Sequence, residues 1–198
     1  MNVNLITALV GFSIVTLFTP GPNNLMLMAS GINFGYRRTL PHLLGVAFGF
    51  AVMLTAVGLG LAQVFTVVPA LRLVLKAVSV VFMLWLAWKI ATEHAPGVEG
   101  KTVGRPLRFG QAAAFQWVNP KAWAIAITAT SAYAPVAGSL GVAIVAVVFC
   151  LTGLASSNTW VLAGRAVARF LRDPRHLRRF NIVMALLLVL TLVPLLQH

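Results

Sequence analysis

Long apolar runs, separated by short polar stretches, occupy most of the chain. Most of these runs reach about 18 residues or more, the length at which an apolar helix can cross the hydrocarbon of a bilayer. The pattern predicts an all-α membrane protein with six transmembrane helices. We expect these helices at about residues 5–28, 43–68, 71–90, 109–133, 138–163 and 180–196.

The composition excludes a soluble or disordered protein. Hydrophobic residues make up 60% of the 198 positions and charged residues only 9%, whereas soluble domains carry about 25% charged residues. The net charge of +12 lies between the apolar runs, so we expect membrane lipid, and not nucleic acid, to meet the basic side chains. A single cysteine, Cys150, rules out an intrachain disulfide.

Lysine and arginine are distributed unevenly between the two sides. Two, four and six of them fall after the first, third and fifth predicted helices, whereas the connection before the third has only Arg72 and Lys76, which enter its first turns. Positive loops stay in the cytoplasm. This pattern predicts that both termini lie outside.

Three helices in each half require the halves to enter the membrane from opposite faces, as in many transporters. The expected organisation is a first three-helix repeat at 1–91, a cytoplasmic connection at 92–108 and an inverted second repeat at 109–198. Pro20 and Pro120 interrupt the first and fourth helices at corresponding positions, and Leu-Gly-Val-Ala recurs at 44–47 and 140–143.

The first interruption combines Pro20, Gly21 and Pro22 with Asn23 and Asn24. Proline removes a backbone N–H and clashes with the preceding turn. In hydrocarbon the freed backbone groups need protein or a polar cavity around them. We predict two half-helices whose ends face a ligand; a simple packing kink is the alternative.

The second interruption carries the one charged residue well inside a predicted helix. A helix starting at Pro120, after Asn119, would place Lys121 at its positive end, where an anion such as a substrate carboxylate can bind. Alternatively, Lys121 marks the cytoplasmic end of a helix that starts near Trp123. Asn158 is a further candidate for the same path, although hydrogen bonding between helices also explains it.

Thr-Pro-Gly-Pro-Asn-Asn at 19–24, Asn-Pro-Lys-Ala at 119–122 and six helices in about 200 residues resemble the LysE/RhtB family of amino-acid exporters. The stretches at 87–92, 160–164 and 181–183 are most similar to its cysteine and O-acetylserine exporter branch. The resemblance implies proton-driven efflux across the bacterial inner membrane, in which case the termini that the charge pattern places outside are periplasmic. It implies functional positions at Pro20, Gly21, Pro22, Asn23, Asn24, Asn119, Pro120 and Lys121.

The acidic residues restrict the substrate. Glu93, Glu99 and Asp173 all fall in predicted cytoplasmic loops, so a cationic side chain or a divalent metal would lack a carboxylate partner in the membrane. We therefore expect a small neutral amino acid, either cysteine/O-acetylserine-like or homoserine/threonine-like, and neither a metal nor a cofactor. We hypothesise that Lys121 itself titrates during proton coupling, and His42 is an alternative proton relay.

An enzyme would need a base, a nucleophile or a metal set at depth, which the predicted helices lack, so we expect a transporter and not an enzyme. No P-loop pattern is present. A channel or assembly subunit without a coupled transport cycle is the main alternative. The preferred amino acid, the proton stoichiometry and the formation of a homodimer stay open at this point.

Overall fold

The computed structural model describes residues 3–93, 104–134, 138–171 and 173–193. These residues form helices and no strands. The longer helices are α1 (Val3–Phe18), α2 (Pro22–Gly58), α4 (Ala70–Ala91), α6 (Pro120–Tyr133), α7 (Gly138–Ala168) and α8 (Pro174–Leu190). The shorter ones are the 3-10 helix η1 (Leu61–Gln63), α3 (Val64–Val67), α5 (Phe109–Phe115) and the 3-10 helix η2 (Gln116–Val118).

Three helices of the described residues are long and apolar enough to cross a membrane, namely Pro22–Gly58, Leu73–Ala91 and Gly138–Ala168. The shorter Val3–Phe18 is also apolar. Large apolar side chains cover the outer surface of these helices; Leu73 is 72% exposed and Leu151 63% exposed. Such a surface suits lipid and not water. The chain is therefore an all-helical membrane protein.

Both interruptions predicted from proline are present. α1 ends at Phe18 and α2 begins at Pro22, while η2 ends at Val118 and α6 begins at Pro120. In each case a proline takes the first position of the new helix, where its missing N–H would have no helical partner and its fixed φ is already helical. A new helix therefore begins at Pro22 and at Pro120.

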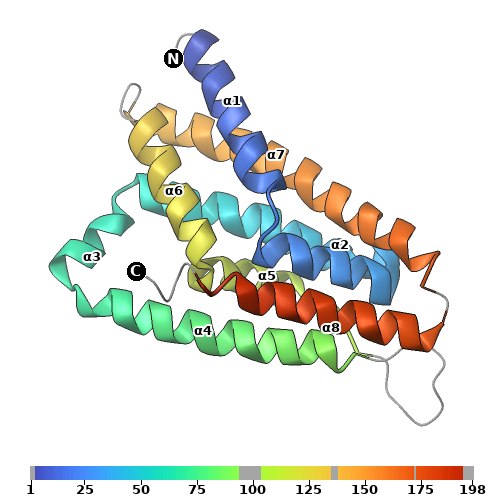
Figure 1. The fold of residues 1–198 in the computed structure, drawn as a ribbon. Helices are drawn as coiled ribbons and strands as arrows, with labels where there is room; N and C mark the ends of the chain where they lie inside the picture. The colour runs from blue at the N-terminus through green and yellow to red at the C-terminus, as the bar shows by residue number, and fades with distance from the viewer. Residues whose placement is uncertain (1–2, 94–103, 135–137, 172, 194–198) are drawn as a thin grey trace.

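The connection expected at about residues 29–42 is much shorter in the structure, because the chain is helical on both sides of Gly35, which alone has a non-helical backbone with φ +74° and ψ 174°. A bond between the Ser30 and His42 side chains, 3.0 Å apart, shows that α2 folds back on itself. In a straight helix these residues would lie about 18 Å apart along the axis. Figure 1 shows the later, cyan part of α2 behind its first, blue part. We call residues 22–34 the first arm and 36–58 the second arm.

Three other boundaries also differ from expectation. The second helix ends at Gly58 and not at 68, because Gly60 adopts a left-handed φ of +107° and a 3-10 turn follows. α7 continues to Ala168, five residues beyond the expected end. α8 begins at Pro174 and not at 180, because the Asp173 side chain caps it by accepting a bond from the Arg175 N–H. Residues 94–103 of the predicted connection at 92–108 lie outside the described residues.

Close backbone contacts hold the bundle together. α2 makes its largest interface with α7, and α4 lies along α8 (Figure 1). A Cβ added at Gly49 would lie only 2.5 Å from the Ala113 Cα, and one at Gly45 would collide with the Phe109 carbonyl oxygen. These two glycines therefore let the second arm of α2 pack directly on α5, the role expected for small residues between membrane helices.

Candidate functional site

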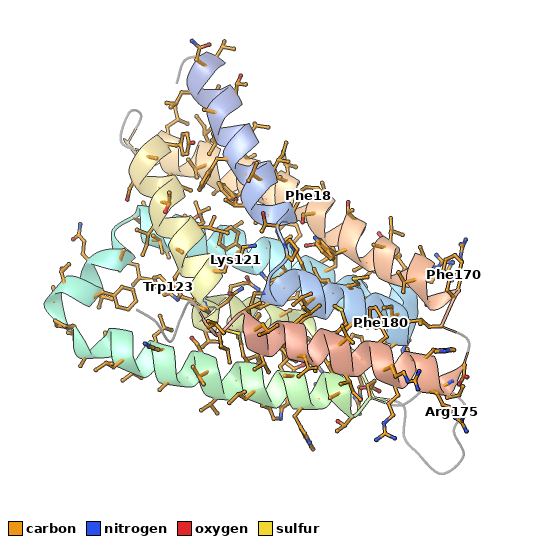
Figure 2. All side chains as sticks on the ribbon, in the orientation of Figure 1. Phe18, Lys121, Trp123, Phe170, Arg175 and Phe180 are labelled. Carbon is orange, nitrogen blue, oxygen red and sulfur yellow. The ribbon has the colours of Figure 1, made fainter. Side chains whose placement is uncertain are left out.

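The two interruptions lie side by side. The Lys121 Nζ donates to the Thr19 carbonyl oxygen at 2.8 Å and to the Pro20 carbonyl oxygen at 3.4 Å. Lys121 lies near the centre of the molecule, between α6 and the start of α2 (Figure 2), whereas the labelled Phe170 and Arg175 lie at one far end. Lys121, from the second interruption, thus donates hydrogen bonds to backbone carbonyl oxygens of the first interruption.

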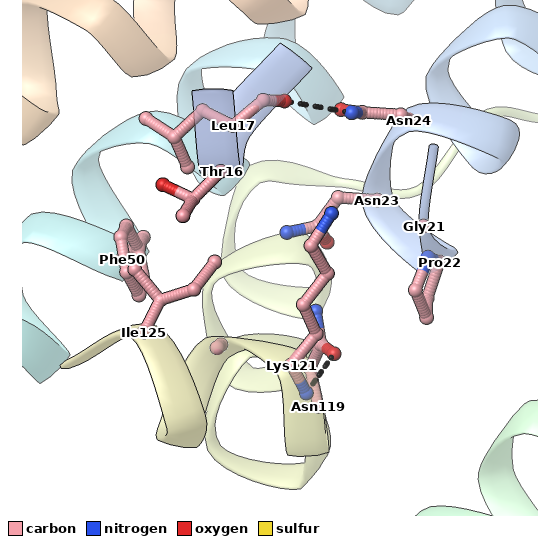
Figure 3. A pocket seen from close by; sticks show the side chains of 11 residues that line it. Thr16, Leu17, Gly21, Pro22, Asn23, Asn24, Phe50, Asn119, Lys121 and Ile125 are labelled. Carbon is pink, nitrogen blue, oxygen red and sulfur yellow. Dashed lines mark hydrogen bonds between the residues drawn. The ribbon is translucent and has the colours of Figure 1, made fainter. Parts of the chain in front are cut away.

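Further side chains bind the carbonyl groups at the end of α1. The Asn24 amide nitrogen donates to the Leu17 carbonyl at 2.7 Å (Figure 3) and also to the Thr19 carbonyl at 2.9 Å. The Ser156 hydroxyl, from α7, donates to the Leu17 carbonyl at 2.8 Å. A helix end inside a membrane requires such partners, because water is not available to replace them. These bonds explain how the interruption is tolerated.

A pair of amides joins the two half-sites. Asn23 donates to the Gln116 side-chain oxygen at 2.9 Å, and Gln116 donates back to the Asn23 oxygen at 3.1 Å. Gln116 is completely buried and also donates to the Ala112 carbonyl. Gln116 was not among the candidates from the sequence. Its position in an apolar run, three residues before Asn119, was the signal that could have identified it.

The N-termini of two helices point into the same region. The Asn119 side chain caps α6 by accepting a bond from the Lys121 N–H at 3.1 Å (Figure 3). The first arm of α2 begins after Gly21, which has no side chain to cap the free N–H groups. Free N–H groups at a helix start attract anions, including carboxylates. The site thus offers both carbonyl acceptors and N–H donors at short range.

A small cavity lies between these groups, with a volume of about 30 Å³. This is room for about two water molecules. Its walls carry the polar side chains of Thr16, Asn23, Asn24, Asn119 and Lys121, and the close-up in Figure 3 shows them from α1, α2 and the start of α6. An amino acid is larger than this volume, so the walls of the cavity must move apart before one can enter.

A much wider cavity, of about 660 Å³, lies on the other side of the same segment. Its apolar walls include Phe65, Leu75, Trp123 and Ile127. Gly21, Pro22 and Lys121 line both cavities, and Pro20 and Pro120 line the wide one. These residues, which we call the partition, therefore lie between the small cavity, which carries the polar side chains named above, and the wide apolar one.

One candidate lies apart from this cluster. Asn158 accepts a bond from the Tyr36 hydroxyl and donates to the Leu154 carbonyl at 2.8 Å. It lines neither of the two cavities. The contact with Tyr36 joins α7 to the second arm of α2, so Asn158 has a bonding partner between helices in this conformation.

Acidic groups do not line either cavity. Among the described residues, Glu93 binds the Gly104 N–H at 3.0 Å, and Asp173 caps α8. No group of three or more His, Cys, Asp or Glu residues that could hold a metal occurs in that part of the chain. Lys121 is the charged side chain of the partition, and nothing acidic opposes it there.

Comparison with known proteins matches residues 14–197 to the family model of the LysE type translocator. The chain is 34% identical over 192 residues to a cysteine/O-acetylserine efflux protein of Salmonella paratyphi A, covering 96% of each chain. It is 33% identical to the cysteine/O-acetylserine efflux protein of Escherichia coli K12, again over 96% of each chain. No solved structure matches the chain significantly. The match over nearly the whole length shows that the chain belongs to the LysE type translocator family, whose members are transporters and not enzymes.

Proposed function

We propose that this protein exports small neutral amino acids from the bacterial cytoplasm across the inner membrane, driven by the proton gradient. The observation that carries the proposal is the contact of Lys121 with the freed carbonyls of Thr19 and Pro20. The relatives named for cysteine and O-acetylserine efflux support this substrate class, because both compounds are small zwitterions.

The site offers a partner for each end of a zwitterion. A substrate ammonium group can take the place of Lys121 on the Thr19 and Pro20 carbonyls. Lys121, once released, can pair with the substrate carboxylate, which also lies near the uncapped N–H groups at the start of α2. Because substrate replaces the contacts that Lys121 loses, binding and movement of the partition are coupled.

We propose six membrane crossings in two inverted repeats, 1–91 and 109–198. The pattern of α1, an interruption and the first arm of α2 matches that of α5, a second interruption and α6. The second arm and α4 would then correspond to α7 and α8. In this arrangement the basic end of α7 is cytoplasmic, both termini are periplasmic and the wide cavity is the outer vestibule.

The test uses inside-out membrane vesicles, in which export appears as uptake, with an imposed pH gradient that is acidic inside. We expect accumulation of labelled cysteine, O-acetylserine or homoserine. Lys121→Gln should abolish accumulation, because glutamine cannot neutralise a carboxylate. Arg165→Gln, which removes a positive charge from an exposed position on α7, is the matched control and should transport normally.

Accumulation of lysine or arginine alone would contradict the substrate class. A channel, the main alternative, would equilibrate the substrate without concentrating it. Accumulation that disappears when an uncoupler is added supports the coupled exporter, whereas uptake that stops at equal concentrations and ignores the uncoupler supports the channel.

A further inference from the structure

A second cavity lies at the far end of the first arm of α2 from the partition. It also has a volume of about 30 Å³. Its polar walls come from Ser30, Asn33 and His42 on the two arms of α2. Its charged walls are Lys89 and Glu93, at the end of α4, and Arg105, before α5. The proposed function assigns no role to this cavity.

His42 is the unusual group in this cavity. Its side chain is 1% exposed, and its Nδ1 lies 3.0 Å from the Ser30 hydroxyl oxygen. Its Nε2 is the one buried side-chain nitrogen or oxygen of the described residues that has no hydrogen-bond partner. Because an unpaired buried polar atom costs about 1–3 kcal/mol, a functional reason for keeping an imidazole here is expected.

The position of His42 connects it to the substrate site. The bond between Ser30 and His42 joins the two arms of α2 across the turn at Gly35. The same first arm carries Asn23 at its other end, seven residues from Ser30, which is about 10 Å along a helix. A change at His42 can therefore act on the helix that forms one side of the partition.

We propose that His42 is the proton-binding group of the transport cycle. It exchanges its proton through this cavity with the cytoplasmic side of the protein, where the basic end of α7 lies in the proposed arrangement. This inference rests on the proposed proton-coupled export. The proton adds to a free lone pair of the imidazole, and no covalent bond breaks. Both ring nitrogens then donate, so the Ser30 oxygen must accept from Nδ1 and a new acceptor must face Nε2.

The charges around His42 act in opposite directions on a protonated imidazole. Lys89 and Arg105 disfavour a further positive charge in the cavity, whereas the Glu93 carboxylate favours it and could accept from Nε2 after a side-chain movement. An imidazole that is in contact with water exchanges protons near neutral pH, so His42 needs water to enter this cavity during the cycle. Lys121, by contrast, already has two acceptors in place. The transported proton therefore belongs at His42, and Lys121 serves substrate binding.

The test compares two activities of the protein in proteoliposomes, with labelled O-acetylserine. The first is accumulation driven by an imposed pH gradient, and the second is exchange of substrate at equal pH without a gradient. His42→Gln keeps a side chain able to bond with Ser30 but removes the titratable group. We expect loss of driven accumulation to the level of empty liposomes, retained exchange, and exchange that no longer depends on pH.

His176→Gln is the matched control, because His176 is 59% exposed beside Asp173 and should leave both activities unchanged. His42→Asn is the second variant if His42→Gln does not fold. Normal driven accumulation in either folded variant overturns the proposal. Loss of exchange together with accumulation overturns it as well, since His42 would then serve packing or substrate binding. A wild-type protein without driven accumulation contradicts the proposed function itself.

Discussion

At the scale of single residues, Lys121 reaches the first interruption only because position 21 has no side chain. A Cβ at Gly21 would lie 2.9 Å from the Lys121 Cδ and 3.1 Å from its Nζ. The Gly21 backbone is extended, with φ −176°, so an alanine there is not strained in itself. The glycine is needed for the approach of the lysine and not for the shape of the chain.

Gly21→Ala should therefore reduce transport while changing stability little. The added methyl group pushes Lys121 away from the Thr19 and Pro20 carbonyls, and we expect a higher KM for substrate uptake with a nearly unchanged Tm in detergent. Gly11→Ala is the control, because a Cβ at Gly11, on α1, meets nothing within 4 Å. Equal transport by the two variants would show that the position of Lys121 does not matter.

The polar residues of this site could be selected from the sequence, because proline, asparagine and lysine are costly in an apolar helix. Their partners could not. We expected Lys121 to bind a substrate carboxylate, whereas in the structure it donates to backbone carbonyl oxygens. Gln116 was not selected, since its role depends on Asn23, which lies 93 positions away along the chain.

At the scale of helices, the reversal within α2 depends on Gly35. Its φ of +74° and ψ of 174° belong to a region that is almost restricted to glycine. A Cβ there would meet nothing within 4 Å, so any effect of a substitution comes from the backbone. The sequence suggested a loop at this place because Arg37 and Arg38 are unfavourable in hydrocarbon, but a single glycine reverses the helix.

Gly35→Ala should destabilise the protein by about 1–3 kcal/mol, the usual cost of such a backbone conformation in a residue other than glycine. The measurement is the Tm of the purified protein in detergent. Gly110→Ala, in α5, is the control, since a Cβ there also meets nothing within 4 Å and the backbone is helical. An unchanged Tm for Gly35→Ala would contradict the reversal at this residue.

The contact between the second arm of α2 and α5 gives a separate prediction. Gly49→Ala places a methyl group 2.5 Å from the Ala113 Cα, and backbone atoms cannot move aside as a flexible side chain does. We expect a loss of about 1–3 kcal/mol, as for other overpacked cores. Gly153→Ala on α7, where the nearest atoms lie 3.9 Å away, should keep its Tm, and similar values for both variants would refute this close packing.

At the scale of the whole molecule, the distribution of charge predicts the orientation. The arginine-rich end of α7 and the start of α8 should face the cytoplasm, and α1 should begin outside. The apolar outer surface of the helices is compatible with either orientation, so the loop charges alone support this choice. The orientation also determines which cavity opens to which side of the membrane.

Cysteine labelling in intact cells measures this orientation. In a Cys150→Ala background, Val3→Cys, at a position that is 78% exposed, should react with a membrane-impermeant thiol reagent added outside. Arg169→Cys, at an exposed position after α7, should react only after the cells are permeabilised. The opposite result would reverse the assignment of the inner and outer cavities.

The sequence by itself determined the helical membrane class, both interruptions and the lack of acidic residues in the apolar runs. These features follow from local physics, because proline lacks an N–H wherever it lies and hydrocarbon excludes charge. Only the tertiary structure decided that α2 reverses at Gly35 and that Lys121 reaches a carbonyl 102 positions away. It also decided that His42 lines one cavity together with Lys89 and Glu93. Such contacts depend on how helices pack, and the pattern along one chain does not contain that information.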